Sequence, residues 1–240
     1  MTDLPKVKFE DLKGESYEFY WNYQKEILQD TIHFKRCSLE ERAEIGRNYQ
    51  RHHLLFVEHT PVYTLGKSGS MDHLLLTPEE QKILGVEFFK INRGGDITYH
   101  GPGQITGYPI FDLEEFFTDV HKYVWSIEES IIQTLKAYGL ESRRIQGFTG
   151  VWIPADERNP INRKICAIGV HMSRWVSMHG FAFNVNTDLS YFDRIVPCGI
   201  VDPDKGVTSL EKELGKKMDL TEVKLKLKDT FASVFNFEFE

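Results

Sequence analysis

Cysteine is scarce in this 240-residue sequence, and the three cysteines lie far apart. Cys37, Cys166 and Cys198 are an odd number and form no Cys-x-x-Cys pair, so the sequence predicts neither a disulfide scaffold nor a cysteine zinc site. Histidine shows neither the His-Glu-x-x-His spacing nor any close cluster, which argues against a metal centre. We therefore expect free thiols and no bound metal.

Long apolar runs are missing as well. No stretch approaches the ~18 consecutive apolar residues that a membrane-spanning helix requires, and the run at residues 54–57 is soon interrupted by charge. The N-terminal segment carries Asp3, Lys6, Lys8 and Glu10 where a secretory signal needs an unbroken apolar segment. We expect a cytoplasmic protein that does not bind membranes.

Positive charge is in deficit, because 29 Lys and Arg stand against 36 Asp and Glu, which leaves a net charge of -7. This balance argues against nucleic-acid binding, which needs a concentrated basic surface. A hydrophobic content of 41% with 13% aromatic residues predicts a folded chain with a sizeable core. No repeat, low-complexity segment or linker divides the sequence, so we expect a single domain.

Apolar periodicity and capping residues predict a mixture of helices and strands. A 3.6-residue period predicts helices over residues 17–36, with a continuation at 39–47, over 116–139, and near the C-terminus from a cap at Thr221. Thr77, Pro78 and Glu80 form a capping signature for a short helix at 78–84. Short β-branched and aromatic runs predict strands at 53–58, 86–91, 149–153, 165–172 and 180–185. The alternation indicates a mixed α/β (α+β) fold with a mixed sheet.

The densest chemical signal is the segment at residues 93–104, Arg-Gly-Gly-Asp-Ile-Thr-Tyr-His-Gly-Pro-Gly-Gln. Its glycines allow the main chain to approach a ligand, while the Thr, Tyr and His side chains project from the strand that follows. A ligand-binding surface is one interpretation, and a tight hairpin with a capping Asp is the alternative. Neither a P-loop nor a Gly-x-Gly-x-x-Gly motif occurs here, so nucleotide binding is not predicted.

Cys198 stands between Pro197 and Gly199, in a turn where a neighbouring backbone N–H can face a developing oxyanion. This setting suits a nucleophile, and the alternative is a buried structural cysteine.

Lys164 stands where a polar segment meets the apolar residues 165–169. Burial in a cleft would lower the pKa of its ammonium group and let it exchange a proton with a thiol, whereas at the surface it would only extend into solvent. A lysine and a cysteine together can carry out acyl transfer.

Small residues recur in the apolar segment at 179–185, where Gly180 and Ala182 alternate with Phe181 and Phe183. A narrow apolar slot for an aliphatic chain is one interpretation. A β-bulge at Gly180 is the other.

Residues 93–104, 164–169, 179–185 and 197–200, taken together and in this order, resemble the lipoyl(octanoyl) transferase family. The match is most specific in the signature Arg-Gly-Gly-x-x-Thr-Tyr-His-Gly-Pro-Gly-Gln. The resemblance implies that residues 1–240 form a single octanoyltransferase catalytic domain, with the α/β fold shared by biotin and lipoate protein ligases.

The resemblance also implies the reaction and its partners. An active-site cysteine takes octanoyl from octanoyl-acyl carrier protein, and the acyl group passes to a lysine of an apo lipoyl domain, as in 2-oxoacid dehydrogenase complexes and the glycine cleavage H protein. Cys198 corresponds to that cysteine, and Lys164 to the lysine that tunes it. A thioester is already activated, so this chemistry needs no ATP, cofactor or metal. The family's substrate-contacting residues correspond to Arg93, Gly94, Gly95, Asp96, Ile97, Thr98, Tyr99, His100, Ala167, Ile168, Gly169, Gly180, Phe181 and Ala182.

One departure from the family pattern is Cys166, where alanine is common. Two residues apart on a strand, Lys164 and Cys166 are expected on the same face, so Cys166 competes with Cys198 for labelling by an alkylating reagent. The polar loop at 154–163 has two interpretations, a mobile lid or a solvated connection.

Acyl carrier proteins and lipoyl domains are typically acidic, as is this chain. We therefore expect docking through a local basic patch that includes Arg143, Arg144, Arg163 and Arg174.

Two other functions stay open at this point. An ATP-dependent lipoate or biotin protein ligase on the same scaffold would need no nucleophilic cysteine. A non-catalytic module that binds acyl chains or lipoyl domains would leave Cys198 inert.

Overall fold

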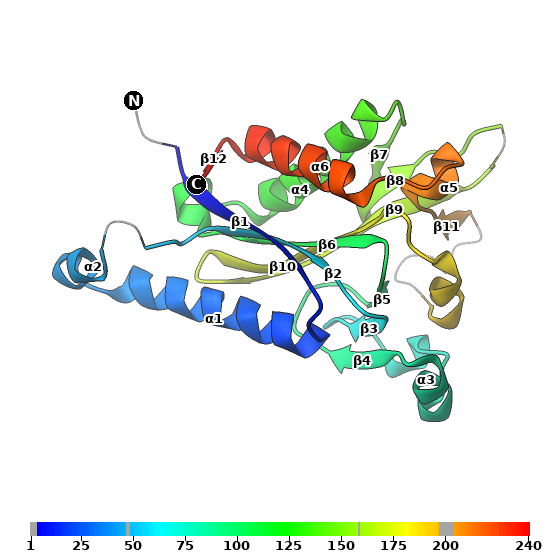
Figure 1. The fold of residues 1–240 in the computed structure, drawn as a ribbon, viewed down its shortest axis with the longest axis horizontal. Helices are drawn as coiled ribbons and strands as arrows, with labels where there is room; N and C mark the ends of the chain where they lie inside the picture. Colours follow the sequence, from blue (N-terminus) through cyan, green and yellow to red (C-terminus); the bar gives the residue numbers. More distant parts are fainter. Residues whose placement is uncertain (1–3, 47–48, 158, 197–203) are drawn as a thin grey trace.

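The computed structural model describes residues 4–46, 49–157, 159–196 and 204–240 (Figure 1). Within these ranges nine strands form the main sheet in the order β12-β1-β2-β6-β10-β9-β8-β7, and β11 pairs with β9 off this path. Their bounds are β1 (Lys6–Lys13), β2 (His53–Glu58), β6 (Gln104–Ile110), β7 (Arg143–Ile145), β8 (Phe148–Ile153), β9 (Asn162–Ser173), β10 (Val176–Asn184), β11 (Lys205–Val207) and β12 (Glu238–Phe239).

The main sheet is mixed. β1 runs parallel to β2 and β12, and β11 runs parallel to β9, whereas the central pairs from β2 through β6, β10, β9 and β8 to β7 are antiparallel. A second, three-stranded sheet has the order β4-β3-β5, with β3 (Val62–Leu65), β4 (Glu87–Lys90) and β5 (Ile97–His100). The expected mixed α/β fold is confirmed.

Helices cover both faces of the main sheet (Figure 1). Helix α1 (Tyr17–Arg36) contacts β10 and β6 on one face, and α4 (Val120–Ala137) packs with α6 (Leu220–Phe235) on the other. Three shorter α-helices and three 3₁₀ helices complete the described chain: α2 (Leu39–Ile45), α3 (Pro78–Leu84), α5 (Leu210–Leu214), η1 (Met71–His73), η2 (Leu113–Glu115) and η3 (Leu189–Arg194).

Several predicted elements are confirmed to the residue. The helix at 17–36, the capped helix at 78–84 and the strand at 53–58 have the expected bounds. In α3 the Thr77 hydroxyl accepts from the Glu80 N–H at 3.2 Å, and the Glu80 carboxylate accepts from the Thr77 N–H at 2.8 Å. This reciprocal pair satisfies two of the free donors at the helix start.

Two expected helix starts are wrong. Helix α4 begins at Val120, because the side chain of Asp119 caps it, and Phe116 instead ends the preceding 3₁₀ turn. Helix α6 is capped by Asp219, whose carboxylate accepts from the N–H of Thr221 at 2.9 Å. In both cases the helix starts where an aspartate side chain accepts its first N–H bonds, three residues after the expected start in α4 and two before the expected cap in α6, and an apolar pattern does not reveal this position.

The largest apolar core lies between the main sheet and the helices α4 and α6. Phe231 of α6 is fully buried there, with its ring stacked on Phe181 at 5.4 Å between centroids and on Phe235 at 5.6 Å. Phe181 also lines the cavity described in the next section, so one wall of that cavity packs directly against this core.

We expect Phe231→Ala to lower the free energy of unfolding by about 3–5 kcal/mol, because a large buried ring leaves a void that the sheet can only partly close. Leu225→Ala on the same helix is the matched control, since Leu225 is 56% exposed, and its effect should stay within about 0.5 kcal/mol. Urea unfolding followed by circular dichroism measures both. Equal losses in the two variants would contradict the assignment of this core.

Candidate functional site

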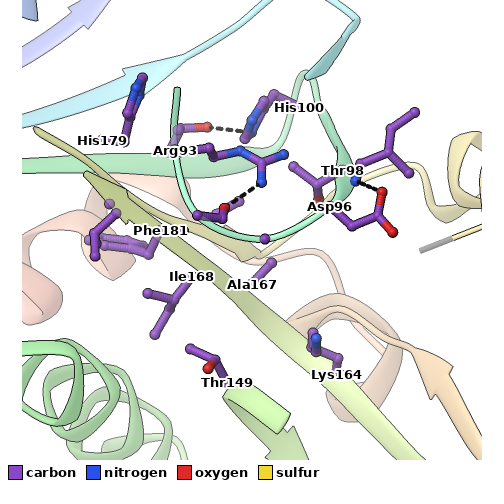
Figure 2. Close-up of a pocket in the computed structure, with 18 of the residues that line it drawn as sticks. Arg93, Asp96, Thr98, His100, Thr149, Lys164, Ala167, Ile168, His179 and Phe181 are labelled. Atoms are coloured by element: carbon purple, nitrogen blue, oxygen red, sulfur yellow. Dashed lines mark hydrogen bonds between the residues drawn. The ribbon is translucent and has the colours of Figure 1, made fainter. Parts of the chain in front are cut away.

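A cavity of about 500 Å³ lies between the glycine-rich segment and strands β9 and β10 (Figure 2). This volume is in the range of small-molecule sites. In Figure 2 the apolar side chains of Ile168 and Phe181 lie in the middle of the cavity, and the polar side chains of His100 and His179 lie near Arg93. The lining residues discussed below are Tyr17, Arg93, Gly94, Gly95, Asp96, Ile97, Thr98, His100, Gln104, Tyr108, Phe148, Thr149, Lys164, Ala167, Ile168, Gly169, His179, Gly180, Phe181, Ala182, Asn184 and Val207.

The glycine-rich segment is docked directly on strand β9. The Gly94 N–H donates to the Val170 carbonyl at 2.9 Å, and a Cβ on Gly169 would lie 2.7 Å from the Gly94 oxygen. A Cβ on Gly180 would lie 2.1 Å from the Gly107 oxygen. These glycines are therefore required for contact between main chains. The slot expected from the small residues at 179–185 does not come from empty space at Gly180, and Gly180 pairs in register with Gly169 without a bulge.

Arg93 holds the segment from inside. Its Nη2 donates to the Thr64 carbonyl at 2.6 Å and to the Thr64 hydroxyl at 3.0 Å, and its Nη1 donates to the Gly94 carbonyl at 3.0 Å. Asp96 adds a further attachment, because its carboxylate lies 2.6 Å from Nδ1 of His73. The segment thus has side-chain hydrogen bonds to β3 and a close side-chain contact with η1, in addition to its main-chain bond to β9.

Two buried histidines line the polar end of the cavity. Burial, followed by the positive charge of Arg93, lowers the pKa of His100 to about 3, and the same two causes lower the pKa of His179 to about 3. His179 Nε2 lies 2.9 Å from Oδ1 of Asn92. Because both pKa values lie far below neutrality, both rings are neutral at physiological pH and hold positions by hydrogen bonding.

Lys164 lies at the opposite end of the cavity. Figure 2 shows it well separated from Arg93 and His100, with Ala167 between them along β9. Its Nζ lies 4.7 Å from the centroid of the Trp152 ring, within the range of a cation–π contact. Thr149 of β8 lines the same end. The apolar centre therefore leads to a lysine.

The expectation that Cys166 shares a face with Lys164 is wrong. Strands β8 and β9 shift register between the pairs Val151↔Cys166 and Trp152↔Lys164, so Ile165 is an extra residue that breaks the two-residue alternation. Cys166 is fully buried in the main core and does not line the cavity. Burial, reinforced by a neighbouring carboxylate, raises the pKa of its thiol well above the usual value. Cys166 is therefore a poor competitor as a nucleophile.

Cys198 lies outside the described residues. Before it in the chain, the Val196 N–H donates to the carbonyl of His73, which contacts Asp96 of the cavity, at 2.8 Å. After it, Val207 lines the cavity and pairs in register with Lys164.

Tyr99 is the described residue of the expected set whose side chain does not line the cavity. Thr98 and His100 face the cavity, so strand alternation directs Tyr99 to the other face of β5. There its ring stacks on Tyr191 with centroids 4.5 Å apart, in the core beneath the small sheet.

Several lining residues were not predicted from the sequence, among them Tyr17, Tyr108, Thr149 and Val207. Tyr17, Thr149 and Val207 come from α1, β8 and β11, which are distant in sequence from the glycine-rich segment, whereas Tyr108 lies on β6, which begins at the last residue of that segment. No local spacing marks these residues, because only the sheet order brings them together.

The expected basic patch is wrong in part. Arg163 is 2% exposed, and its guanidinium pairs with Glu213 at 2.8 Å and Asp156 at 2.9 Å. Arg144 pairs with Glu128 at 2.9 Å and with Glu129 at 2.8 Å. These local carboxylates offset two of the four expected charges. Arg163 also ties the loop at 154–163 to α5.

Among the described residues no group of three His, Cys, Asp or Glu side chains is placed to hold a metal ion. None of the helices within the described ranges is both long enough and apolar enough to cross a membrane.

The model of the lipoyl protein ligase A/B catalytic domain family matches residues 16–232. An octanoyltransferase of Flavobacterium johnsoniae is 53% identical over 234 residues, covering 97% of this chain and 98% of the relative. One from Christiangramia forsetii is 53% identical over 237 residues, covering 98% of each.

Solved structures share the fold. A bipartite lipoate protein ligase from Thermoplasma acidophilum has a TM-score of 0.65 at 16% identity, over 98% of this chain and 86% of that chain. A lipoate-protein ligase A bound with ATP has a TM-score of 0.63 at 14% identity, over 99% and 87%. The family match and the identity to the curated relatives together show that this chain belongs to the lipoyl protein ligase A/B family and is an acyltransferase of its octanoyltransferase group.

Proposed function

We propose that this enzyme takes the octanoyl group from octanoyl-acyl carrier protein onto Cys198 and passes it to a lysine of an apo lipoyl domain. The observation that carries the proposal is the cavity itself, in which apolar side chains of β9 and β10 lead to Lys164. An aliphatic chain fits the apolar centre, and the reacting carbonyl then belongs at the lysine end.

The first half-reaction forms a thioester on the enzyme. The Cys198 thiolate attacks the octanoyl carbonyl, the new C–S bond forms, and the bond to the carrier's phosphopantetheine sulfur breaks. Lys164 takes the proton from the Cys198 thiol and returns it to the departing pantetheine thiolate. Exchange of one thioester for another is close to balanced, so the step needs no input of energy.

The second half-reaction forms an amide. The amine of the lipoyl-domain lysine attacks the acyl-Cys198 carbonyl, and the Cys198 thiolate leaves. Lys164 accepts the proton that the amine must lose. Because Cys198 holds the acyl group between the two steps, the two protein partners need not be bound together.

The proton carrier in this scheme is Lys164 rather than a histidine. His100 and His179 line the cavity, but burial holds the pKa of each near 3, so neither can carry a proton at neutral pH.

Lipoyl domains that could accept the octanoyl group occur in 2-oxoacid dehydrogenase complexes and in the glycine cleavage H protein, and we propose both as partners. We propose the cytoplasm as the location, where the fatty-acid carrier would supply the donor.

Incubation with octanoyl-acyl carrier protein in the absence of ATP should add one octanoyl group to the wild-type enzyme, as measured by intact mass. The adduct should be discharged by hydroxylamine, and it should be absent from Cys198→Ser. Cys37→Ser is the matched control, because Cys37 is a partly exposed cysteine remote from the cavity, and it should be acylated like the wild type.

Acylation of Cys198→Ser would refute the nucleophile assignment. Modification of a lipoyl domain only when ATP and free octanoate are supplied would instead indicate the ligase reaction.

Replacing Lys164 with Arg should lower kcat by roughly 10²–10⁴-fold, because a guanidinium cannot give up a proton and general acid–base catalysis is worth about that much. Lys205→Arg is the control, since Lys205 also lies over an aromatic ring, that of Phe148 at 4.3 Å, and does not line the cavity. Steady-state transfer to a lipoyl domain measures both. Full activity in Lys164→Arg would exclude the proton-carrier role.

A further inference from the structure

The strand that carries Lys164 loses its regular support at this residue. On one edge of β9, the register with β8 shifts between Cys166 and Lys164. On the other edge, β10 pairs with β9 only as far as Phe183↔Cys166, and β11 takes over with Val207↔Lys164. Both ladders of β9 therefore become irregular at one place, where Lys164 pairs with Trp152 on one edge and with Val207 on the other. On the second edge, the position of Lys164 depends on the short strand β11 instead of the long β10 ladder.

A side chain spans this interruption. Asn184, the last residue of β10, donates from Nδ2 to the Thr208 carbonyl at 3.1 Å, just beyond the end of β11. The Thr208 N–H in turn donates to the Lys164 carbonyl at 3.0 Å. Asn184 thus connects the end of β10 through Thr208 to the main chain of Lys164.

The amide of Asn184 is itself held in one orientation. Its Oδ1 accepts from Nε2 of Gln104 at 2.9 Å, and Gln104 is its register partner on β6. Gln104 Nε2 also donates to the Tyr99 carbonyl at 3.0 Å. Both hydrogens of Gln104 Nε2 are therefore used, and the orientation of the amide is fixed. Its Oε1 faces Nδ1 of His100 at 2.9 Å and accepts from the Thr106 hydroxyl at 3.1 Å.

The orientation of the Gln104 amide also fixes the tautomer of His100. Nδ1 carries the hydrogen that Gln104 accepts, so Nε2 is an acceptor and lies 3.2 Å from the Thr64 hydroxyl. The Thr64 hydroxyl accepts from Arg93 and can donate to that nitrogen. One directed chain of hydrogen bonds runs from Arg93 through His100 and Gln104 to Asn184.

We propose that Asn184 and Gln104 are positioning residues that set the place of Lys164 at the end of the cavity, by holding Thr208 against β9. The chain couples the glycine-rich segment to the lysine across three strands of the sheet. Its side chains are buried, with Asn184 4% and Gln104 1% exposed, so water does not readily replace a lost bond. This inference rests on the proposed role of Lys164 as proton carrier.

Asn184→Asp tests the link with almost no change in shape. The ionised carboxylate would place an acceptor against the Thr208 carbonyl, whereas the protonated acid can donate to it again. The charged groups facing this position are Lys164 beyond Thr208, Glu213, which accepts from the Thr208 hydroxyl at 2.6 Å, and Arg163, which pairs with Glu213. His100, facing Gln104, stays neutral over the tested range.

At pH 8 we expect Asn184→Asp to lower kcat by roughly 10–100-fold, the scale at which a small misplacement of a catalytic group acts, with KM little changed. As the pH falls toward 5.5, the ratio of variant to wild-type kcat should rise toward one, because protonation restores the donor. A purely structural defect would not recover on acidification.

Asn186→Asp is the matched control. Asn186 also donates from Nδ2 to a main-chain carbonyl, that of Met218 at 2.9 Å, but this bond leads to the start of α6 and away from the cavity. Its kcat ratio to wild type should stay near one and flat with pH. Equal behaviour of the two variants, or a flat pH ratio for Asn184→Asp, would overturn the inference.

Two further readouts keep the test decisive. If thermal unfolding shows that Asn184→Asp does not fold, Gln104→Glu is tested in its place. In either variant, a rise in KM with an unchanged kcat would indicate contact with the substrate and would overturn the positioning role. The rate of acetic anhydride labelling of Lys164, measured by peptide mass, should change in Asn184→Asp at pH 8 and not in Asn186→Asp.

The same experiments separate this inference from the proposed function. If the wild-type enzyme forms no octanoyl adduct, the proposed function is contradicted. If the adduct forms normally and the variants are unaffected, only this inference is contradicted.

Discussion

The contact on which the site depends is the docking of the glycine-rich segment on strand β9. One main-chain bond, from Gly94 to the Val170 carbonyl, and a close approach at Gly169 bring the two together. A side chain at Gly169 is not tolerated, because its Cβ would lie 2.7 Å from the Gly94 carbonyl oxygen. Without this contact the segment would leave one side of the cavity open, and the apolar chain site would be exposed to water.

A buried positive charge follows from the same arrangement. Arg93 donates to the main chain of the segment itself at Gly94 and to that of β3 at Thr64. The charge that it brings into the site lowers the pKa values of His100 and His179 beyond what burial does alone. Histidine is usually the first candidate for proton transfer near neutral pH. Here the lowered pKa values leave both rings as neutral hydrogen-bonding groups, which agrees with the proposal that Lys164, at the other end of the cavity, carries the proton.

The sequence predicted what is local and missed what is not. The bounds of α1 and the capping box of α3 follow from residues three to four positions apart, and both were predicted correctly. Cys166 was placed wrongly because a bulge at Ile165 depends on the partner strand β8. Arg163 was expected at the surface, yet its partner Glu213 lies on a helix far along the chain. Of the expected lining residues in the described chain, Tyr99 is the one that does not line the cavity, because strand alternation turns its ring to the other face of β5, which the motif does not reveal.

The fold by itself does not decide the reaction. Structures of lipoate protein ligases, including one bound with ATP, share this architecture at 14–16% identity, so the sheet and its helices are common to different chemistries. What separates the reactions is how the acyl group is activated. A ligase must first spend a nucleotide to activate a free acid, whereas an octanoyltransferase starts from an activated acyl group. An enzyme of the second kind needs a nucleophile, a proton carrier and an enclosed apolar chain site. In this chain Lys164 lies at one end of the cavity, and strand β9 carries both Lys164 and the apolar lining residues Ala167 and Ile168. On the function proposed above, one strand of the scaffold shared with the ligases therefore holds both the proton carrier and part of the acyl-chain site.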